Sequence, residues 1–228
     1  MIEFLLLDLD DTILDFRKSE EYGIRKTLSD AGIEPTDHIC LRYSQINKEH
    51  WKRLERGEIT RDRLLISRFE ELFQELGTDA DPKPSAAAYM DNMASVHFFL
   101  PGAEEAVKTL SAKYRTFIVS NGTSSAQERR LTSANLYPYF EQVFISQLIG
   151  INKPAREFFD RCFVQIPGFD PKKAIIVGDS LSSDIQGGIN AGITTCWVNP
   201  EHKPPRSDIP ADYEIESITQ LEALLARL

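Results

Sequence analysis

Short, nearly continuous apolar runs recur along the chain, and several stop directly before a small or acidic polar residue. Runs of this kind are typical of parallel β-strands that are covered on both faces. The runs expected to form strands are 4–7, 116–119, 142–145, 174–177 and 194–198. Helical patterns at 103–114 and 126–134 lie between them. This alternation predicts an α/β fold with a doubly wound, mostly parallel, Rossmann-like sheet.

Residues 16–98 interrupt the alternation, because they show helical periodicity and no convincing strand. Helices are expected at 38–56, 60–76 and 86–96, with a loop at 81–85 before the last of them. We therefore predict two domains, an α/β core formed by residues 1–15 and 99–228 and an inserted helical cap formed by residues 16–98. If the cap closes over a site, Ile13–Phe16 and Gly102 are the candidate hinges.

The composition narrows the class of protein. The chain has 228 residues and a net charge of −9, which argues against nucleic acid as a partner because nucleic-acid binders carry basic surfaces. No apolar stretch approaches the roughly 20 residues that cross a bilayer, and a cationic secretion signal is missing, so no membrane partner is expected. Cys40, Cys162 and Cys196 lack metal-ligand spacing. They are expected to be reduced packing residues, which predicts a cytoplasmic protein.

Clustered polar residues follow the predicted strands. A buried strand should not end in the paired carboxylates of Asp8 and Asp10 unless something offsets their desolvation and repulsion. Carboxyl ends of parallel strands meet at one edge of a sheet. The segments expected there are Asp8-Leu9-Asp10-Asp11-Thr12, Ser120-Asn121-Gly122, Lys153-Pro154 and Gly178-Asp179-Ser180 with Asp184. Each alone has an ordinary explanation as a helix start, a turn or a solvated lysine, but together they favour an active site.

This set of segments resembles the haloacid dehalogenase superfamily, in its phosphohydrolase branch, over essentially the whole chain. The resemblance implies that Asp8 is a nucleophile that attacks phosphorus and forms an aspartyl-phosphate. Asp10 would protonate the leaving alkoxide and then activate water, and Thr12 would help to position Asp10. Dehalogenases of the superfamily lack an aspartate at the position of Asp10, since halide needs no general acid. Asp10 therefore favours phosphate-ester chemistry. No catalytic role is expected for Asp11, which is interpreted as an acid at the start of the following helix.

The resemblance also implies a phosphate site formed by Thr12, Ser120, Asn121 and Lys153. Phosphate monoesters repel anionic nucleophiles, so their hydrolysis depends on charge neutralisation and in-line positioning. The ammonium group of Lys153 supplies a point positive charge for this purpose. The polar or acidic residue that often follows Lys-Pro in the superfamily is Ala155 here, which leaves the contacts of this loop open.

A magnesium site is the third implication. By resemblance, the carboxylates of Asp8 and Asp179 and the backbone carbonyl of Asp10 would bind Mg²⁺. Asp184 would steady the metal shell or Lys153. Hard oxygen ligands of this kind select Mg²⁺ over softer transition metals.

The helical insertion has a narrower resemblance, to pyrimidine 5′-nucleotidases that act on noncanonical nucleotides. The matching features are Asn47, Trp51, Gly57-x-Ile59-Thr60, Arg68-Phe69-Glu70 and, in the core, the segment from Asp184 to Gly192 followed by Thr195-Cys196-Trp197. Seven basic residues and four acids lie between Lys48 and Arg68. This excess could attract a phosphate ester, although a solvated helix face with ion pairs is the commoner explanation. Trp51 and Phe69 are either base-stacking or core residues.

The resulting expectation is a Mg²⁺-dependent phosphomonoester hydrolase for pyrimidine nucleoside monophosphates such as UMP, dUMP and dTMP. A sugar-phosphate or phosphoglycolate-type phosphatase and a phosphosugar mutase would use the same core. A 2-haloacid dehalogenase and a non-catalytic binding protein are the remaining alternatives. The sequence leaves the physiological substrate and the oligomeric state open.

Overall fold

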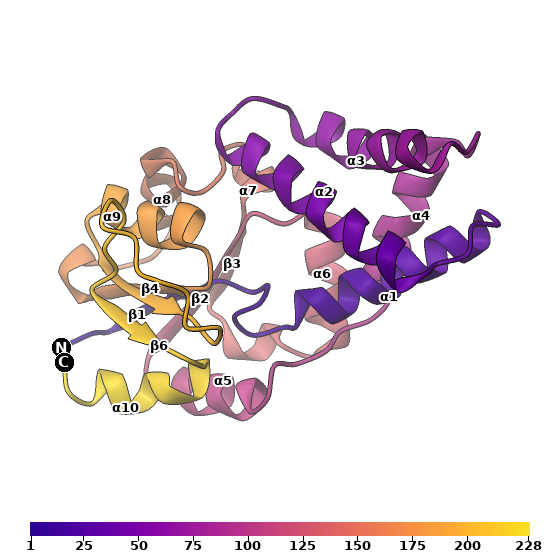
Figure 1. The fold of residues 1–228 in the computed structure, drawn as a ribbon. Coiled ribbons are helices and arrows are strands. Elements are labelled where there is room, and N and C mark those ends of the chain that lie inside the picture. Colours follow the sequence, from indigo (N-terminus) through magenta and orange to yellow (C-terminus); the bar gives the residue numbers. More distant parts are fainter. The chain divides into compact units, whose positions relative to one another are not determined.

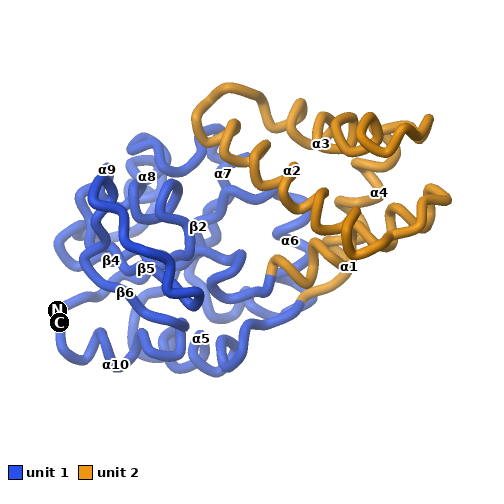
Figure 2. Tube along the Cα trace, viewed as in Figure 1, with its two compact units in different colours: residues 1–15, 98–228 blue, residues 16–97 orange.

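The computed structural model describes all 228 residues and divides them into two compact units (Figure 2). Residues 1–15 and 98–228 form the core unit, and residues 16–97 form the helical unit. The helical unit is therefore an insertion in the chain of the core unit. None of the helices has the length and apolar composition needed to cross a membrane.

The core unit contains a six-stranded sheet in which every pair of neighbouring strands is parallel (Figure 1). Its strands follow the spatial order β3-β2-β1-β4-β5-β6. They are β1 (Phe4–Leu7), β2 (Arg115–Ser120), β3 (Gln142–Ile145), β4 (Ala174–Gly178), β5 (Thr194–Val198) and β6 (Tyr213–Ile215). The predicted doubly wound α/β class is confirmed. The three-residue edge strand β6 was not predicted, because so short a segment carries little periodicity.

Helices and helical turns connect these strands. The α-helices of the core unit are α5 (Ala103–Ser111), α6 (Ser124–Ser133), α7 (Ser146–Ile149), α8 (Arg156–Phe163), α9 (Gln186–Ala191) and α10 (Leu221–Leu225). Its shorter turns are η1 (Tyr137–Tyr139), η2 (Pro171–Lys173), η3 (Leu181–Ile185) and η4 (Ile218–Gln220). The turn η3 is π-helical, a form that often occurs at functional sites.

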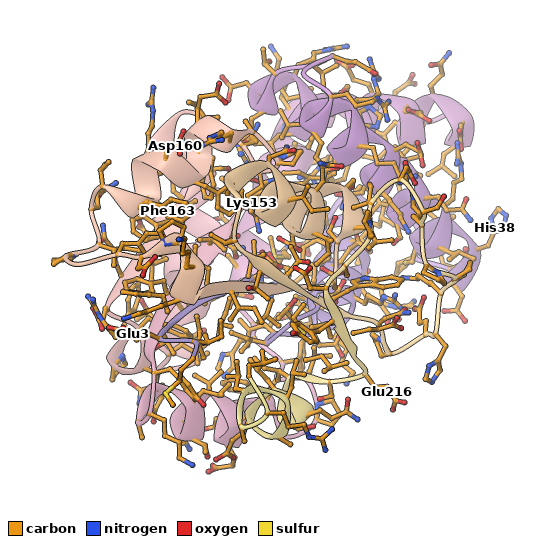
Figure 3. The ribbon with its side chains drawn as sticks, turned by 90° about the vertical axis from the view of Figure 1, so that its left-hand side faces the viewer. Glu3, His38, Lys153, Asp160, Phe163 and Glu216 are labelled. Carbon is orange, nitrogen blue, oxygen red and sulfur yellow. The ribbon has the colours of Figure 1, made fainter.

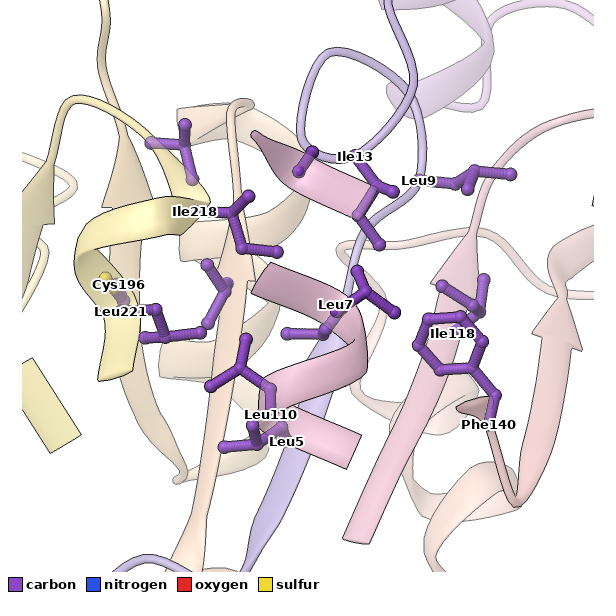
Figure 4. Close-up of a cluster of buried hydrophobic side chains, with 14 of the residues drawn as sticks. Leu5, Leu7, Leu9, Ile13, Leu110, Ile118, Phe140, Cys196, Ile218 and Leu221 are labelled. Carbon is purple, nitrogen blue, oxygen red and sulfur yellow. The ribbon is translucent and has the colours of Figure 1, made fainter. Parts of the chain in front are cut away.

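Both faces of the sheet are buried, as near-continuous apolar strands require. Leu5 and Leu7 point to one face, where they join a cluster that includes Leu110 of α5 and Leu221 of α10 (Figure 4). Phe4 and Leu6 alternate with them and belong to a second cluster, which is built around Phe158 and Phe159 of α8. Each such side chain contributes roughly 1.5–3 kcal/mol when it is removed from water. The three cysteines are buried and unpaired, as predicted.

The strand register brings the predicted polar segments to one edge. Leu7, the last residue of β1, pairs with Ile118 of β2 and with Val177 of β4. The residues that follow these positions therefore emerge at the same carboxyl edge of the sheet, where ligand sites of open α/β sheets are built. Asp8 is the first residue beyond β1 at this edge, and its backbone N–H donates to the carbonyl of Val177 at 2.9 Å.

The helical unit consists of α1 (Phe16–Asp30), α2 (Asp37–Glu55), α3 (Arg61–Leu76) and α4 (Pro82–Ala94). The side chains of Thr36, Thr60 and Asp81 accept hydrogen bonds from the first turns of α2, α3 and α4. The predicted loop at 81–85 is wrong, because α4 begins at Pro82. Proline is tolerated in a first helical turn, whose N–H groups have no partner within the helix.

A polar network lies inside the helical unit. The guanidinium of Arg68, which is 1% exposed, donates to Oδ1 of Asn47 at 2.8 Å. The amide of Asn47 donates in turn to Glu20 at 2.6 Å. The ring of Tyr89 lies 4.6 Å from the Arg68 guanidinium, and Phe69 is also buried. Asn47, Arg68 and Phe69 are therefore core residues of this unit.

The other basic side chains of the stretch 48–68 mostly pair with nearby acids at the surface. These pairs are Lys52 with Glu49, Arg53 and Arg56 with Glu58, and Arg63 with Glu70. Arg61 lies instead over the ring of Trp51, at 5.5 Å from its centroid. Most of the positive charge is thus locally balanced, in agreement with the solvated-face interpretation.

The buried network should contribute much more to stability than the surface pairs. We expect Arg68→Met to lower the free energy of unfolding by roughly 3–5 kcal/mol, because the variant leaves Glu20 and Asn47 buried without their cation. Arg63→Met, which removes the exposed pair with Glu70, should cost less than about 1 kcal/mol. Urea unfolding followed by circular dichroism measures both changes. Equal losses would contradict a dominant role for the network.

Candidate active site

Asp8 is a buried carboxylate at the end of a strand whose four residues are all buried. It is 7% exposed, and burial raises its pKa from 3.8 to about 8, against the opposing effect of Lys153. The repulsion of Asp184 and Asp10 adds to the increase. Asp8 is therefore held in a site that favours an additional positive charge.

The ammonium group of Lys153 makes three hydrogen bonds. It donates to Oδ1 of Asp8 at 2.8 Å, to Oδ1 of Asp184 at 2.6 Å and to the carbonyl of Val119 at 2.7 Å. Lys153 is 1% exposed, and Figure 3 labels it together with Asp160 and Phe163 of helix α8. Burial by itself would lower its pKa, but the charges of Asp184 and Asp8 outweigh that effect and raise the pKa. Lys153 is thus a permanent buried cation.

Asn121 holds the backbone of Lys153 in place. Its Oδ1 accepts from the N–H of Lys153 at 2.9 Å, and its Nδ2 donates to the carbonyl of Lys153 at 2.9 Å. The same amide nitrogen also donates to Oγ of Ser183 at 3.2 Å. Both ends of the Asn121 amide are engaged in these contacts. They give this residue a positioning role beside the phosphate contact predicted from the sequence.

Asp184 reaches Lys153 from the π-helical turn after β4. Its Oδ1 accepts from Lys153, and its Oδ2 accepts from the backbone N–H of Ser180 at 3.1 Å. A Cβ atom at Gly178 would overlap the Asp184 carboxylate, so glycine is required at the end of β4. The Gly-Asp-Ser sequence therefore allows the turn to fold back on the strand that it follows.

Three carboxylates converge at this point. One oxygen from each of Asp8, Asp179 and Asp184 lies within 4.8 Å of the others. Burial, followed by the charge of Asp184, raises the pKa of Asp179 well above its usual range. Three carboxylates against the single ammonium of Lys153 leave excess negative charge. Hard oxygen donors with excess negative charge are suited to Mg²⁺. The donor set therefore fits the predicted metal, and Asp184 contributes the third carboxylate of the group.

Asp10 lies in a different environment, although only one residue separates it from Asp8. Its Oδ1 accepts from the guanidinium of Arg130, and its Oδ2 accepts from Nε2 of Gln127 at 2.6 Å. Gln127 Nε2 also donates to Oγ of Ser120 at 2.9 Å. Both new residues belong to α6 and were missed in the sequence. Their spacing by three residues on the buried side of a helix, directly after the Ser-Asn-Gly segment, was the available signal.

Thr12 and Asp11 complete the loop after β1. Thr12 is fully buried, and its hydroxyl has no hydrogen-bond partner, so the hydrogen bonds to the Asp10 carboxylate described above come from α6 instead. Asp11 adopts a left-handed conformation with φ of 55°, which aspartate tolerates better than most residues. It lies in a turn well before α1. The interpretation of Asp11 as a helix-start acid is therefore wrong.

The fold and this centre define an α/β enzyme with an acid-rich site at the carboxyl edge of a parallel sheet. The model of the haloacid dehalogenase-like hydrolase family matches residues 2–192. The chain belongs to this family and is a hydrolase.

Similar proteins cover nearly the whole chain. The HAD-hydrolase YfnB of Bacillus subtilis is 37% identical over 97% of this chain and 94% of its own length. The pyrimidine 5′-nucleotidase PynA of Streptococcus pneumoniae is 36% identical over 96% of this chain and 93% of its own. The pyrimidine 5′-nucleotidase YjjG of Escherichia coli is 31% identical over 99% of this chain and 98% of its own length. The resemblance to this subgroup, predicted from the sequence, is confirmed.

Solved structures agree with the fold. The structure of YfnB bound to magnesium, which reveals interdomain movement, has a TM-score of 0.94 over 98% of both chains. L-2-haloacid dehalogenase from Xanthobacter autotrophicus has a TM-score of 0.78 at 17% identity, over 99% of both chains. At that identity, the second likeness shows the fold alone.

The raised pKa of Asp8 predicts a pH-dependent effect on the stability of the metal-free protein. The folded protein holds the Asp8 proton more tightly than the unfolded chain. The contribution of Asp8 to stability is therefore fully present below its ordinary value of 3.8 and is lost as pH rises through about 8. We expect Asp8→Asn to gain melting temperature relative to the wild type as pH rises over this interval. Thermal unfolding in EDTA at a series of pH values measures this difference in melting temperature. Asp208→Asn, at an exposed carboxylate, is the control. A difference independent of pH would contradict the raised pKa.

Proposed function

We propose that this enzyme is a Mg²⁺-dependent phosphomonoester hydrolase that works through an aspartyl-phosphate on Asp8 and prefers pyrimidine nucleoside 5′-monophosphates. The observation that supports it most is the separation of two neighbouring carboxylates into different environments. Asp8 contacts Lys153 beside the three-carboxylate group, whereas Asp10 contacts Gln127 and Arg130. This difference supports the assignment of nucleophilic attack to Asp8 and of proton transfer to Asp10.

In the first step, an oxygen of Asp8 forms a bond to phosphorus while the bond from phosphorus to the ester oxygen breaks. Asp10 gives its proton to the leaving alkoxide. In the second step, water attacks the phosphorus of the aspartyl-phosphate and gives a proton to Asp10. The bond between phosphorus and the Asp8 oxygen breaks, which releases inorganic phosphate and restores both residues.

The positive charge that this chemistry needs comes from two sources. Lys153 lies 2.8 Å from Asp8 and can offset the charge of phosphoryl oxygens next to the nucleophile. Mg²⁺, held by Asp8 and Asp179 with Asp184 close by, would supply further neutralisation of the phosphoryl group. The magnesium bound in the solved YfnB structure supports this assignment. The backbone carbonyl of Asp10 stays a predicted ligand.

The substrate proposal is supported by the names of the relatives. PynA and YjjG are pyrimidine 5′-nucleotidases. Other relatives are also phosphatases. Among them are glyceraldehyde 3-phosphate phosphatase of Methanopyrus kandleri at 26% identity and mouse N-acylneuraminate-9-phosphatase at 31% identity. The reaction class is thus common to these relatives, whereas the leaving group varies.

The nucleophile assignment makes a direct prediction. Asp8→Asn should lower kcat at least ~10³-fold, because an amide cannot form the covalent intermediate. EDTA should abolish wild-type activity, and added Mg²⁺ should restore it. Phosphate release from 4-nitrophenyl phosphate and UMP measures both effects. Asp208→Asn, at an exposed carboxylate paired with Arg206, is the matched control and should keep full activity. Substantial turnover by a folded Asp8→Asn variant would rule out this nucleophile.

The substrate assignment is tested separately, with a panel of phosphate esters. UMP, dUMP and dTMP should have kcat/KM values at least ~10-fold above those of AMP, glucose 6-phosphate and phosphoglycolate, which corresponds to roughly 1.4 kcal/mol of discrimination. Equal values would leave the phosphatase intact but refute the pyrimidine preference. Phosphorus NMR of the products distinguishes a mutase, which would transfer phosphate to another hydroxyl instead of releasing it.

A further inference from the structure

Helix α6 presents two buried polar side chains to the residues that would carry out the reaction. Gln127 and Arg130 are 2% and 0% exposed, and both donate to the carboxylate of Asp10. Arg130 contacts Oδ1 and Gln127 contacts Oδ2, so each oxygen has a separate donor. A carboxylate that is bound through both oxygens to two buried donors has a restricted orientation.

The two donors are also bonded to each other. The guanidinium of Arg130 donates to Oε1 of Gln127 at 3.0 Å, while Nε2 of Gln127 donates to Asp10. This arrangement determines which way the Gln127 amide faces. A second acceptor for Nε2 is Oγ of Ser120 at 2.9 Å, and that oxygen also accepts from the N–H of Gly122 at 3.0 Å. One side chain therefore joins Asp10 to Ser120.

Gly122 provides the space that Gln127 needs. A Cβ atom built at Gly122 would overlap the Gln127 side chain along its length, from Cγ to Nε2. The glycine of the Ser-Asn-Gly segment is thus explained by the approach of Gln127. An added methyl group here would displace Gln127, whose side chain is flexible.

We propose that Gln127 and Arg130 are positioning residues that orient Asp10 toward the leaving-group oxygen and, through Gln127, couple Asp10 to Ser120. The proposal rests on the proposed phosphatase function. A proton donor contributes only when it lies within hydrogen-bond reach of the ester oxygen. Loss of its orientation should therefore matter for alkyl esters, whose alkoxide needs a proton to leave. It should matter little for 4-nitrophenyl phosphate, whose leaving group is a stable anion.

The test compares kcat/KM for UMP and 4-nitrophenyl phosphate, since this parameter covers the steps through the first phosphoryl transfer. Arg130→Met should lower the value for UMP by about 10²-fold and the value for 4-nitrophenyl phosphate by less than about 3-fold. Arg130→Lys, which keeps a cation, should recover part of the loss. Gln127→Leu and Gly122→Ala should show the same selectivity, together with a higher KM for both substrates because Ser120 is released. Arg129→Met, at the exposed neighbour on α6, should match the wild type.

A double-mutant cycle with Asp10→Asn completes the test. If Arg130 acts through Asp10, then Arg130→Met should add no further selectivity in the Asp10→Asn background. Equal losses for both substrates, or unchanged kinetics in folded variants, would overturn the proposal and assign α6 a purely structural role. Melting temperatures identify the folded variants, and Arg130→Lys and Gly122→Ala keep the test valid if Arg130→Met does not fold. A wild-type protein that hydrolyses neither ester would instead refute the proposed function.

Discussion

The buried ammonium group of Lys153 is the interaction on which the rest of the site depends. Its three hydrogen bonds connect Asp8 after β1, Val119 in β2 and Asp184 in the turn after β4. An ammonium group has three donors, and all three are satisfied here without water. Removing one partner from a buried ion pair costs roughly 3–5 kcal/mol, because the remaining charge stays desolvated. Lys153 therefore determines both the local charge and how closely three segments of the core can approach one another.

The strand order explains why this contact forms where it does. The chain runs from β1 outward to β2 and β3, and then returns to β4 on the other side of β1. The carboxyl end of β1 is thus the point where the connections diverge, which is the usual ligand site of a doubly wound sheet. From the β2 side come Ser120 and helix α6, and from the β4 side come Asp179 and Asp184. The site is assembled from both halves of the sheet around a single strand end.

Much of this arrangement was predictable because it depends on short-range patterns. Apolar runs gave five of the six strands, and polar residues after them gave Asp8, Ser120 and Asp179. Side-chain contacts across the sheet were not predictable, because they depend on how helices pack. The pairing of Arg130 with Asp10 joins residues 120 positions apart. Asn47 and Arg68 matched a family pattern, yet their burial inside the helical unit follows from the packing of α1, α2 and α3. The helix start at Pro82 could not be told from a loop in the sequence, because proline is typical both of loops and of the first turn of a helix.

The proposed division of roles between Asp8 and Asp10 follows from their surroundings and does not require any difference in chemical type. Asp8 lies among other carboxylates, and its pKa is raised by burial, so a cation is needed to keep it ionised and nucleophilic. Lys153 provides part of that charge, and the convergence of Asp179 and Asp184 provides a place for more. Asp10 is not part of the three-carboxylate group and is held by donors of α6. The two environments are built by different elements, although the charge of Asp10 still contributes to the raised pKa of Asp8. In the proposed mechanism, the loop that carries both residues therefore separates attack from proton transfer between two residues that are only two positions apart in the chain.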